Sequence, residues 1–387
     1  MKPKILLVTS WYPNKDSPLN GIFVQEQATF LSTIYDVCIL YIHVNSWKLL
    51  IKNGFNVHQN SQIEDHDNIK VIREFAFRLP RNFLLYHLYL HAAKRGFDKI
   101  LNIWGKPDII HAHVLLPGGW GASEIAKEYN IPVVMTEHSG TFSEEFAKIY
   151  RHPLGVIALK KMDNVIAVSP SLEQTIISYH SAINTTVIGN VIDTNFFTCS
   201  QRKEDNYKKK FLTISLLTKI KGVDFLLEAA HALLQQGYQS FELIIGGDGV
   251  ERASLENKAL KLDLSKQSRF LGLLSRSEVR YWMQQCDVFV MPSLLETFCI
   301  VIAEAMACGK PVISTYCGGP EFIVLPETGI LVEPGNSISL AEAMEKFILE
   351  EIQYDADYIR QTIIDRFSPN AFIKNINAVY EPLLGKK

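Results

Sequence analysis

Residues 292–315, with the sequence PSLLETFCIVIAEAMACGKPVIST, contain the pattern that decides the fold. The six residues before them, CDVFVM, form a short apolar and β-branched run, which is typical of a buried parallel strand. A helix is predicted over residues 298–308, because these residues favour helix and because Gly309 and Pro311 form a stop signal. A second strand is predicted over residues 312–314. This order predicts a βαβ crossover whose loop lies at the sheet edge where open α/β proteins bind ligands.

Two carboxylates lie in this unit, Glu296 in the loop and Glu304 within the predicted helix. Eight helical steps would separate them by roughly 12 Å. That is too far for two carboxyl groups to share a proton, but it suits hydroxyl-rich groups at the two ends of a diphosphate. The alternative interpretation is a solvated helix residue at Glu304 and an N-terminal dipole partner at Glu296.

Composition limits the class of protein. The chain has 387 residues, enough for two domains of ordinary size. A hydrophobic content of 47% is that of a soluble globular protein, and a net charge of −2 argues against a general nucleic-acid binder. The six cysteines show no CxxC pairing and indicate free thiols in a reducing compartment. The sequence contains no signal-peptide core and no membrane-spanning run, so a cytoplasmic protein is expected.

The stretch at 292–315, with its Glu-x7-Glu pair, resembles the signature of the group 1, family 4 glycosyltransferases, which use nucleotide sugars. Other strings carry the same resemblance: DIIHAHVLLPGG at 108–119, TEHSGTF at 136–142, KIKG at 219–222, CGGPE at 317–321 and TGILVEPG at 328–335. The resemblance covers most of the second half of the chain and scattered elements of the first. It implies the GT-B fold, an α/β architecture of two Rossmann-like doubly wound domains facing across a cleft. The donor would bind the second domain and the acceptor the first.

The predicted strands place the first domain at residues 1–198 and the second at residues 211–366. Between them, the string CSQRKEDNYKKK at 199–210 is charged and has no periodicity, which predicts a linker. Residues 367–387 are predicted to form a terminal helix, which the resemblance to GT-B proteins returns to the first domain.

The resemblance also implies the roles of individual residues. Glu304 is expected on the ribose hydroxyls and Glu296 on the hydroxyls of the sugar ring. Lys221 is expected on the phosphates and His138 at the transferred sugar, and these two with Glu296 form the expected catalytic set. His113 is expected to face the acceptor. Further donor-binding residues are expected at several positions: Gly21, Lys219, Gly247, Gly249, Thr297, Phe298, Cys299 and Ile300.

Each of these residue types also has an ordinary structural interpretation. Without the resemblance, Gly21 would be a turn glycine, His138 a satisfied structural histidine, and the two lysines of the KIKG string solvated loop residues. His111 and His113, at i and i+2 on a predicted strand, point the same way, but the sequence offers no third ligand beside them. No metal site is therefore predicted.

The chain departs from the family pattern at two places. Leu216 stands where the family has an arginine, which removes a charge-assisted contact of about 1.5–3 kcal/mol. Either Lys219 substitutes for it or the donor is held differently. Thr297-Phe298-Cys299 stands where Gly-Phe-Gly is common, and Thr297 and Cys299 keep the backbone N–H groups in place only if φ is ordinary at both.

The segment at 73–95 interleaves cations with aromatic and leucine side chains; the cations are Arg73, Arg78, Arg81, Lys94 and Arg95. This pattern is typical of a membrane-surface helix or loop, and it would imply a lipid-linked acceptor at the inner face of the plasma membrane. The other interpretation is an amphipathic helix that faces the core, with solvated arginines.

The predicted function is a retaining, metal-independent hexosyltransferase, as the resemblance implies. It would move a sugar from a nucleotide-diphosphate sugar, UDP- in preference to GDP-, to a hydroxyl of a saccharide or lipid-linked saccharide. Cell-surface polysaccharide synthesis (lipopolysaccharide or capsule) is the expected pathway. No cofactor is expected besides the nucleotide-sugar co-substrate, because lysines and helix N-termini can spread the charge of a diphosphate without Mg²⁺.

Retaining chemistry of this type is thought to follow a front-face path in which the departing phosphate accepts the acceptor's proton, so no protein general base is named. Two other functions stay open. One is a non-catalytic GT-B-like protein that binds nucleotide or sugar, which Leu216, Thr297 and Cys299 favour. The other is a nucleotide-sugar epimerase of the same fold.

Overall fold

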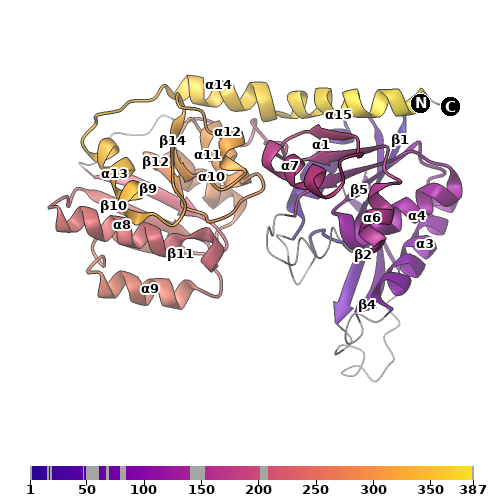
Figure 1. The fold of residues 1–387 in the computed structure, drawn as a ribbon, viewed down its shortest axis with the longest axis horizontal. Coiled ribbons are helices and arrows are strands. Elements are labelled where there is room, and N and C mark those ends of the chain that lie inside the picture. Colours follow the sequence, from indigo (N-terminus) through magenta and orange to yellow (C-terminus); the bar gives the residue numbers. More distant parts are fainter. Residues whose placement is uncertain are drawn as a thin grey trace. The chain divides into compact units, whose positions relative to one another are not determined.

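The computed structural model describes residues 2–46, 48, 61–78, 84–139, 153–200 and 208–385, apart from 15–16, 18–19 and 67–68. The chain divides into two compact units. Unit 1 consists of Met1–Val191 and Phe372–Lys387, and unit 2 of Ile192–Ala371. In each unit, helices lie on both faces of a mostly parallel sheet (Figure 1).

Within its described residues, unit 1 has an eight-stranded sheet in the order β3-β4-β2-β1-β5-β6-β7-β8, parallel except where β3 meets β4. Its strands are β1 (Lys4–Thr9), β2 (Asp36–Ser46), β3 (Gln62–His66), β4 (Ile69–Arg78), β5 (Ile109–His113), β6 (Val133–Glu137), β7 (Asn164–Ala167) and β8 (Thr185–Val187). Its helices are α1 (Ile22–Leu31), α3 (Leu85–Ile103), α4 (Trp120–Tyr129), α6 (Pro153–Leu159), α7 (Pro170–Tyr179) and most of α15 (Pro369–Leu384).

Within its described residues, unit 2 has a six-stranded parallel sheet in the order β11-β10-β9-β12-β13-β14. Its strands are β9 (Lys209–Ile214), β10 (Phe241–Gly246), β11 (Ser268–Gly272), β12 (Val288–Met291), β13 (Val312–Thr315) and β14 (Gly329–Val332). Its helices are α8 (Val223–Gln235), α9 (Arg252–Lys261), α10 (Arg276–Gln285), α11 (Ile300–Ala307), α12 (Pro320–Ile323), α13 (Ser337–Ile348) and α14 (Ala356–Phe367).

The strand order reverses once in each sheet, between β1 and β5 in unit 1 and between β9 and β12 in unit 2. Such switch points leave a crevice at the carboxyl ends of the two central strands, where doubly wound proteins bind their ligands. The central strands β1 and β12 are buried on both faces, which explains their apolar runs, ILLV within β1 and VFVM in β12.

Aspartates that immediately precede strands help to align the sheets. The carboxylate of Asp108 accepts the backbone N–H of Lys4 at 2.8 Å, and that of Asp163 accepts the N–H of Val133 at 2.9 Å. Asp287 accepts the N–H of Lys210 at 2.7 Å in unit 2. Each contact satisfies a backbone donor at the start of a neighbouring strand, beyond the ladder of the sheet.

The boundary between the units differs from the one that the sequence predicts. Residues 192–198 pack on unit 2, where Arg360 of α14 donates to the carbonyls of Thr194 and Phe197 at 2.7 Å each. The boundary therefore falls after Val191 and not after residue 198. In the predicted linker, residues 209–210 already belong to β9, and residues 201–207 lie outside the described residues.

The return of the chain to unit 1 is carried by α15. Its side chains Phe372, Ile376 and Tyr380 are buried in the core of unit 1, together with β1 and β2 side chains. The helix begins at Pro369, two residues after the predicted start at residue 367, because α14 continues to Phe367 and Ser368 separates the two helices.

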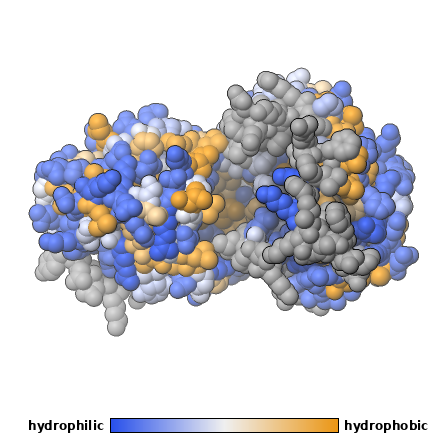
Figure 2. Space-filling model, turned by 90° about the horizontal axis from the view of Figure 1, so that it is seen from below, coloured by the Kyte–Doolittle hydropathy of each residue, from blue (hydrophilic) through white to orange (hydrophobic). Residues whose placement is uncertain are grey.

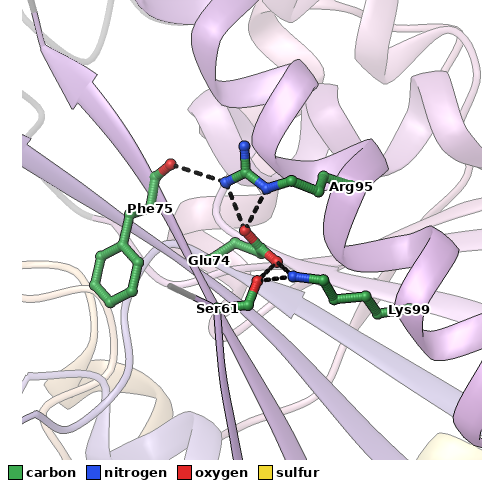
Figure 3. A network of polar contacts seen from close by, with 5 residues as sticks. All are labelled: Ser61, Glu74, Phe75, Arg95 and Lys99. Atoms are coloured by element: carbon green, nitrogen blue, oxygen red, sulfur yellow. Dashed lines mark hydrogen bonds and ion pairs between the residues drawn. The ribbon is translucent and has the colours of Figure 1, made fainter. Parts of the chain in front are cut away.

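Three of the cations of the segment at 73–95 have carboxylate partners inside unit 1. Arg95 of α3 donates to the buried Glu74 of β4 at 2.6 and 2.8 Å, and Lys99 reaches the other carboxylate oxygen at 2.9 Å (Figure 3). Arg73 pairs with Glu64 at 2.9 Å, and Lys94 lies 2.6 Å from Glu128, whereas Arg81 lies outside the described residues. These pairs favour the interpretation of α3 as an amphipathic helix packed on the core, and membrane contact stays a prediction.

Candidate functional site

Predicted site residues meet at the switch point of unit 2. Lys221 ends a short helical turn after β9, and its ammonium donates to Oε1 of Glu296 at 2.7 Å. Ser293, just after β12, donates its hydroxyl to the same oxygen at 2.8 Å. Glu296 is also fixed through its backbone, because its N–H donates to the carbonyl of Cys317 at 3.1 Å. The structure thus joins two expected catalytic residues that lie 75 positions apart in the sequence.

The charge state of Lys221 follows from this setting. Burial, the largest single influence, favours the neutral amine, but the charge and the hydrogen bond of the Glu296 carboxylate raise the pKa of Lys221 above its ordinary value. Lys221 is therefore an ammonium at neutral pH. A cation held at this edge of the sheet, in a largely desolvated place, is suited to bind an anion.

Helix α11 begins later than predicted. Its first residue is Ile300, and Glu296 instead forms a bridge with Gly318. The assumption of eight helical steps between Glu296 and Glu304 is therefore wrong, because only the residues from Ile300 onward follow a helical rise. Glu304 lies in the second turn of α11 and is partly exposed.

The residue before α11 has an unusual backbone conformation. Cys299 has φ 74° and ψ 70°, in the left-handed region that favours glycine. The condition of an ordinary φ is therefore not met at Cys299, whereas Thr297 is not among the described residues with positive φ. The Phe298 side chain is buried against Phe322 and Phe367, so only its backbone could take part in donor binding.

The backbone packing of unit 2 requires glycine at two positions of the turn after β10. A Cβ at Gly247 would lie 1.9 Å from the carbonyl oxygen of Ser215, and a Cβ at Gly249 would lie 2.4 Å from that of Leu217. The N–H of Gly247 donates to the carbonyl of Gly272 at 2.8 Å. Close backbone packing therefore explains both glycines, whether or not a nucleotide lies nearby.

Exposed apolar side chains follow three neighbouring strands of unit 2. Leu216 comes after β9, Val250 after β10 and Leu273 after β11, with exposed fractions of 65%, 86% and 66%. Lys219, the residue expected to compensate for Leu216, is also exposed. On the side of unit 2 seen in Figure 2, hydrophobic residues lie among hydrophilic ones and do not form one continuous area.

In unit 1, three histidines form a buried stack at the carboxyl edge of the sheet. The rings of His111 and His113 on β5 are stacked with their centroids 4.7 Å apart, and His138, just after β6, stacks on His113 at 5.2 Å. Nδ1 of His113 lies 3.0 Å from Nε2 of His138, within hydrogen-bonding distance. Burial lowers the pKa of His138 to about 3, so its imidazole is neutral at physiological pH.

Two residues in contact with this stack, Tyr380 and Phe23, are not predicted as site residues by any pattern in the sequence. The hydroxyl of Tyr380 on α15 lies 2.5 Å from Nδ1 of His111, and Phe23 of α1 lies with its ring centroid 4.2 Å from that of His138. Gly21 makes the second contact possible. It turns the chain into α1 with φ 68°, and a Cβ there would lie 2.3 Å from the carbonyl oxygen of Trp11.

Among the described residues, no group of three or more His, Cys, Asp or Glu side chains is arranged to hold a metal ion. None of the described helices combines the length and the apolar character needed to cross a bilayer. The predicted site residues thus form two groups, one in each unit: Gly21, His113 and His138 in unit 1, and the remaining ones in unit 2.

Comparison with known proteins gives a consistent result. The model "Glycosyltransferase Family 4" matches residues 50–196, and the model "Glycosyl transferases group 1" matches residues 197–365. The putative teichuronic acid biosynthesis glycosyltransferase TuaC of Bacillus subtilis is 25% identical over 399 residues, covering 98% of both chains.

A human phosphatidylinositol N-acetylglucosaminyltransferase chain is 33% identical over 249 residues, which are 62% of this chain but only half of that protein. The crystal structure of Anabaena HepE in complex with UDP superposes with a TM-score of 0.74 at 21% identity, over 99% of this chain and 100% of that one. The matched models cover both units in turn, and the structural match confirms the predicted architecture of two α/β units. The chain belongs to the group 1, family 4 glycosyltransferases and has the GT-B fold.

Proposed function

We propose that this chain is a retaining glycosyltransferase. It transfers the hexose of a UDP-hexose to a hydroxyl of a saccharide or lipid-linked saccharide, with UDP as the leaving group, during cell-surface polysaccharide synthesis. The observation that carries the proposal is the Lys221–Glu296 pair at the switch point of unit 2, next to the N-terminus of α11. The name of TuaC, a relative over its whole length, supports the polysaccharide pathway, and the UDP bound to HepE supports uracil as the base.

In this proposal, Lys221 and the N-terminus of α11 neutralise the diphosphate. Both supply positive charge without a metal ion, and the first turn of α11 contains no acidic residue to oppose it. Glu296 holds hydroxyls of the sugar, while Glu304 in the second turn of α11 holds the ribose. Lys219 stands three positions after Leu216 and would supply the missing cation.

The neutral state of His138 limits its part in the reaction. With a pKa of about 3, it holds no positive charge to stabilise a leaving phosphate at pH 7. It can hydrogen-bond a sugar hydroxyl, which suits a residue that orients the transferred sugar. This agrees with a front-face path in which the departing phosphate, and not a protein base, takes the acceptor's proton.

A second function is favoured by specific residues. Leu216 places an exposed apolar side chain where the family has a cation, and Cys299 places a Cβ where the family has glycine. Both changes would weaken phosphate binding, as expected of a non-catalytic protein that binds nucleotide or sugar. Release of UDP from UDP-sugars by the purified protein, abolished in Glu296→Gln, would exclude that function.

The proposal is tested first by calorimetric titration with UDP and GDP. We expect micromolar binding of UDP and weaker binding of GDP. Glu304→Ala should bind UDP about 10-fold or more weakly, because it loses charge-assisted hydrogen bonds to the ribose. Glu342→Ala, which changes an exposed glutamate on α13, is the matched control.

Equal affinity of the wild type, Glu304→Ala and Glu342→Ala for UDP would contradict the role of Glu304. Tighter binding of GDP than of UDP would overturn the donor assignment but leave the transferase activity open. If neither nucleotide binds, the altered phosphate site at Leu216 and Cys299 is not a donor site, and the proposal fails.

A further inference from the structure

Glu137, the last residue of β6, is a fully buried carboxylate with an unusual set of partners. One oxygen, Oε2, accepts the backbone N–H of Leu115 at 2.9 Å. The other, Oε1, accepts the N–H of His138 at 3.0 Å, and the N–H and hydroxyl of Ser139 at 2.8 and 2.5 Å. The carboxylate thus joins the chain after β5 to the chain after β6, with one oxygen on each side.

The residue between His113 and Leu115 is strained. Val114 has φ 67° and ψ 133°, a region that β-branched residues almost never adopt. Hydrogen bonds hold it there: its N–H donates to the carbonyl of Thr136 at 2.9 Å, and its carbonyl accepts the N–H of Gly119 at 2.8 Å. The contact from Leu115 to Glu137 fixes the next peptide as well.

Strain of this kind persists only where the surroundings enforce it, and it gathers at functional sites. Here it falls directly after His113, whose Nδ1 lies 3.0 Å from Nε2 of His138. Glu137 contacts the chain close to both histidines. Its partner Leu115 lies two positions after His113, and its partner Ser139 lies one position after His138. A shift of either loop would change the distance between the imidazoles.

We propose that Glu137 is a positioning residue, which holds the loops after β5 and β6 so that His113 orients the His138 ring toward the transferred sugar. Only the contact of His138 with the transferred sugar rests on the proposed function. The orientation of the two imidazoles can be measured without any substrate, so the two can fail separately.

A buried carboxylate can also be purely structural, and unit 1 contains a matched example. Glu74 is equally buried, but its partners are the side chains of Arg95, Lys99 and Ser61, as Figure 3 shows. They come from α3 and from the residue before β3, and none of them is a site residue. Glu74→Gln is therefore the control for loss of stability without loss of positioning.

The first variant is Glu137→Gln. An amide keeps one acceptor oxygen and places an NH₂ group on the other side, where it faces backbone N–H donors, so one half of the contact must open. Ser139→Ala is the milder second variant, because it removes only the hydroxyl that donates to Oε1. It keeps the proposal testable if Glu137→Gln does not fold.

The direct measurement is ¹⁵N NMR of histidine-labelled full-length protein. We expect Glu137→Gln and Ser139→Ala to shift the ring signals of His113 and His138, while Glu74→Gln leaves them as in the wild type. In transfer assays, Glu137→Gln should lower kcat by about 10-fold or more, as misplacement of a site group does. The KM for the donor should change by less than about 3-fold, because the residues proposed to hold its ribose and diphosphate, such as Glu304 and Lys221, lie in unit 2.

Val114→Gly supplies an independent check, because glycine adopts the conformation of Val114 without strain. If the Glu137 contact helps to enforce that strain, Glu137→Gln lets the wild-type backbone relax and regain part of the lost stability. It should therefore lower Tm less in the wild type than in the Val114→Gly background. Additive losses would show that the two residues are not coupled.

The proposal is overturned if Glu137→Gln and Ser139→Ala leave the imidazole signals unchanged, or if Glu137→Gln and Glu74→Gln lower kcat equally at equal folded fraction. A wild-type protein that transfers no sugar would contradict the proposed function. The NMR signals would then decide the positioning role by themselves.

Discussion

At the scale of single residues, Cys299 has a backbone conformation that is unfavourable for a residue with a Cβ atom. Its φ of 74° makes it one of six described non-glycine residues with positive φ. A Cβ in this region costs about 1–2 kcal/mol in L-residues. The thiol is buried beside Lys221 and Glu296, and burial raises its pKa well above the ordinary value, so it stays protonated.

Replacing Cys299 by glycine and by alanine separates the thiol from the strain. Both variants lose the thiol, but only Cys299→Gly relieves the left-handed conformation. We expect Cys299→Gly to exceed Cys299→Ala in free energy of unfolding by about 1 kcal/mol, after the entropy that glycine adds to the unfolded chain. Urea unfolding measures the difference. Equal stability of the two variants would show that the conformation at this residue is not strained.

The sequence predicts the location of the two turn glycines, but not the contacts that require glycine there. The sequence predicts Gly21 and Gly247 at loops that bind a ligand, and the structure places both in turns with positive φ. Their necessity, however, comes from Trp11 and Ser215, whose carbonyl oxygens leave no room for a Cβ. Such contacts depend on tertiary packing, which the pattern of a single sequence does not contain.

At the scale of elements, α15 connects the C-terminal end of the chain to the histidine stack. Tyr380 is fully buried, and its hydroxyl lies 2.5 Å from Nδ1 of His111, whose Nε2 lies 2.7 Å from the hydroxyl of Thr136. The same helix accepts a hydrogen bond from Tyr35 at Asn377, at 2.8 Å. In both contacts, α15 contributes a side chain (Tyr380 or Asn377) that lies far in the sequence from its partner.

Tyr380→Phe tests how much this element stabilises unit 1. The change removes the partner of a buried imidazole nitrogen and should lower the free energy of unfolding by about 1–3 kcal/mol. Tyr358→Phe on α14 is the control, because that side chain is half exposed and its loss of a hydroxyl should change stability by less than about 0.5 kcal/mol. Equal effects in thermal unfolding would mean that the His111 contact contributes nothing.

Elements with buried apolar runs were predictable, and polar ones were not. The sequence predicts the strand β12 within two residues of its actual bounds, because VFVM is a continuous run of apolar residues buried on both faces. The edge strand β3, with the sequence QIEDH, was missed. Its charged side chains protect an exposed edge and give no apolar signal.

At the scale of the whole molecule, histidines are divided unequally between the units. His231 is the single histidine of unit 2, whereas the other ten, including the buried stack, belong to unit 1. Burial lowers the pKa of His111 and of His138 from 6.5 to about 3, and it lowers that of His113 well below 6.5. The two units should therefore respond differently to acid.

The direction of the effect follows from proton binding. Because the folded-state pKa values lie below 6.5, only the unfolded chain takes up these protons as the pH falls from 6.5 toward 3, and the folded state loses stability over that range. Each histidine contributes about 1.4 kcal/mol per pH unit, so the three together give roughly 4 kcal/mol per unit. His111 faces Tyr380 and Thr136, and His138 faces His113 and Phe23, so no carboxylate among these partners offsets the loss.

We therefore expect unit 1 to unfold in acid at a higher pH than unit 2, near pH 5 if its stability is that of an ordinary domain. The sequence places Trp282 in unit 2 and the other four tryptophans in unit 1, so fluorescence of Trp282→Phe reports on unit 1 alone. Urea midpoints of this variant should fall steeply between pH 6.5 and 5, and adding His113→Gln should remove about one proton from the slope. His231→Gln is the control and should leave the slope unchanged. A midpoint that stays constant over this range would mean that the stacked histidines remain accessible to protons in the folded protein, which would also remove the neutral imidazole that the proposed role of His138 requires.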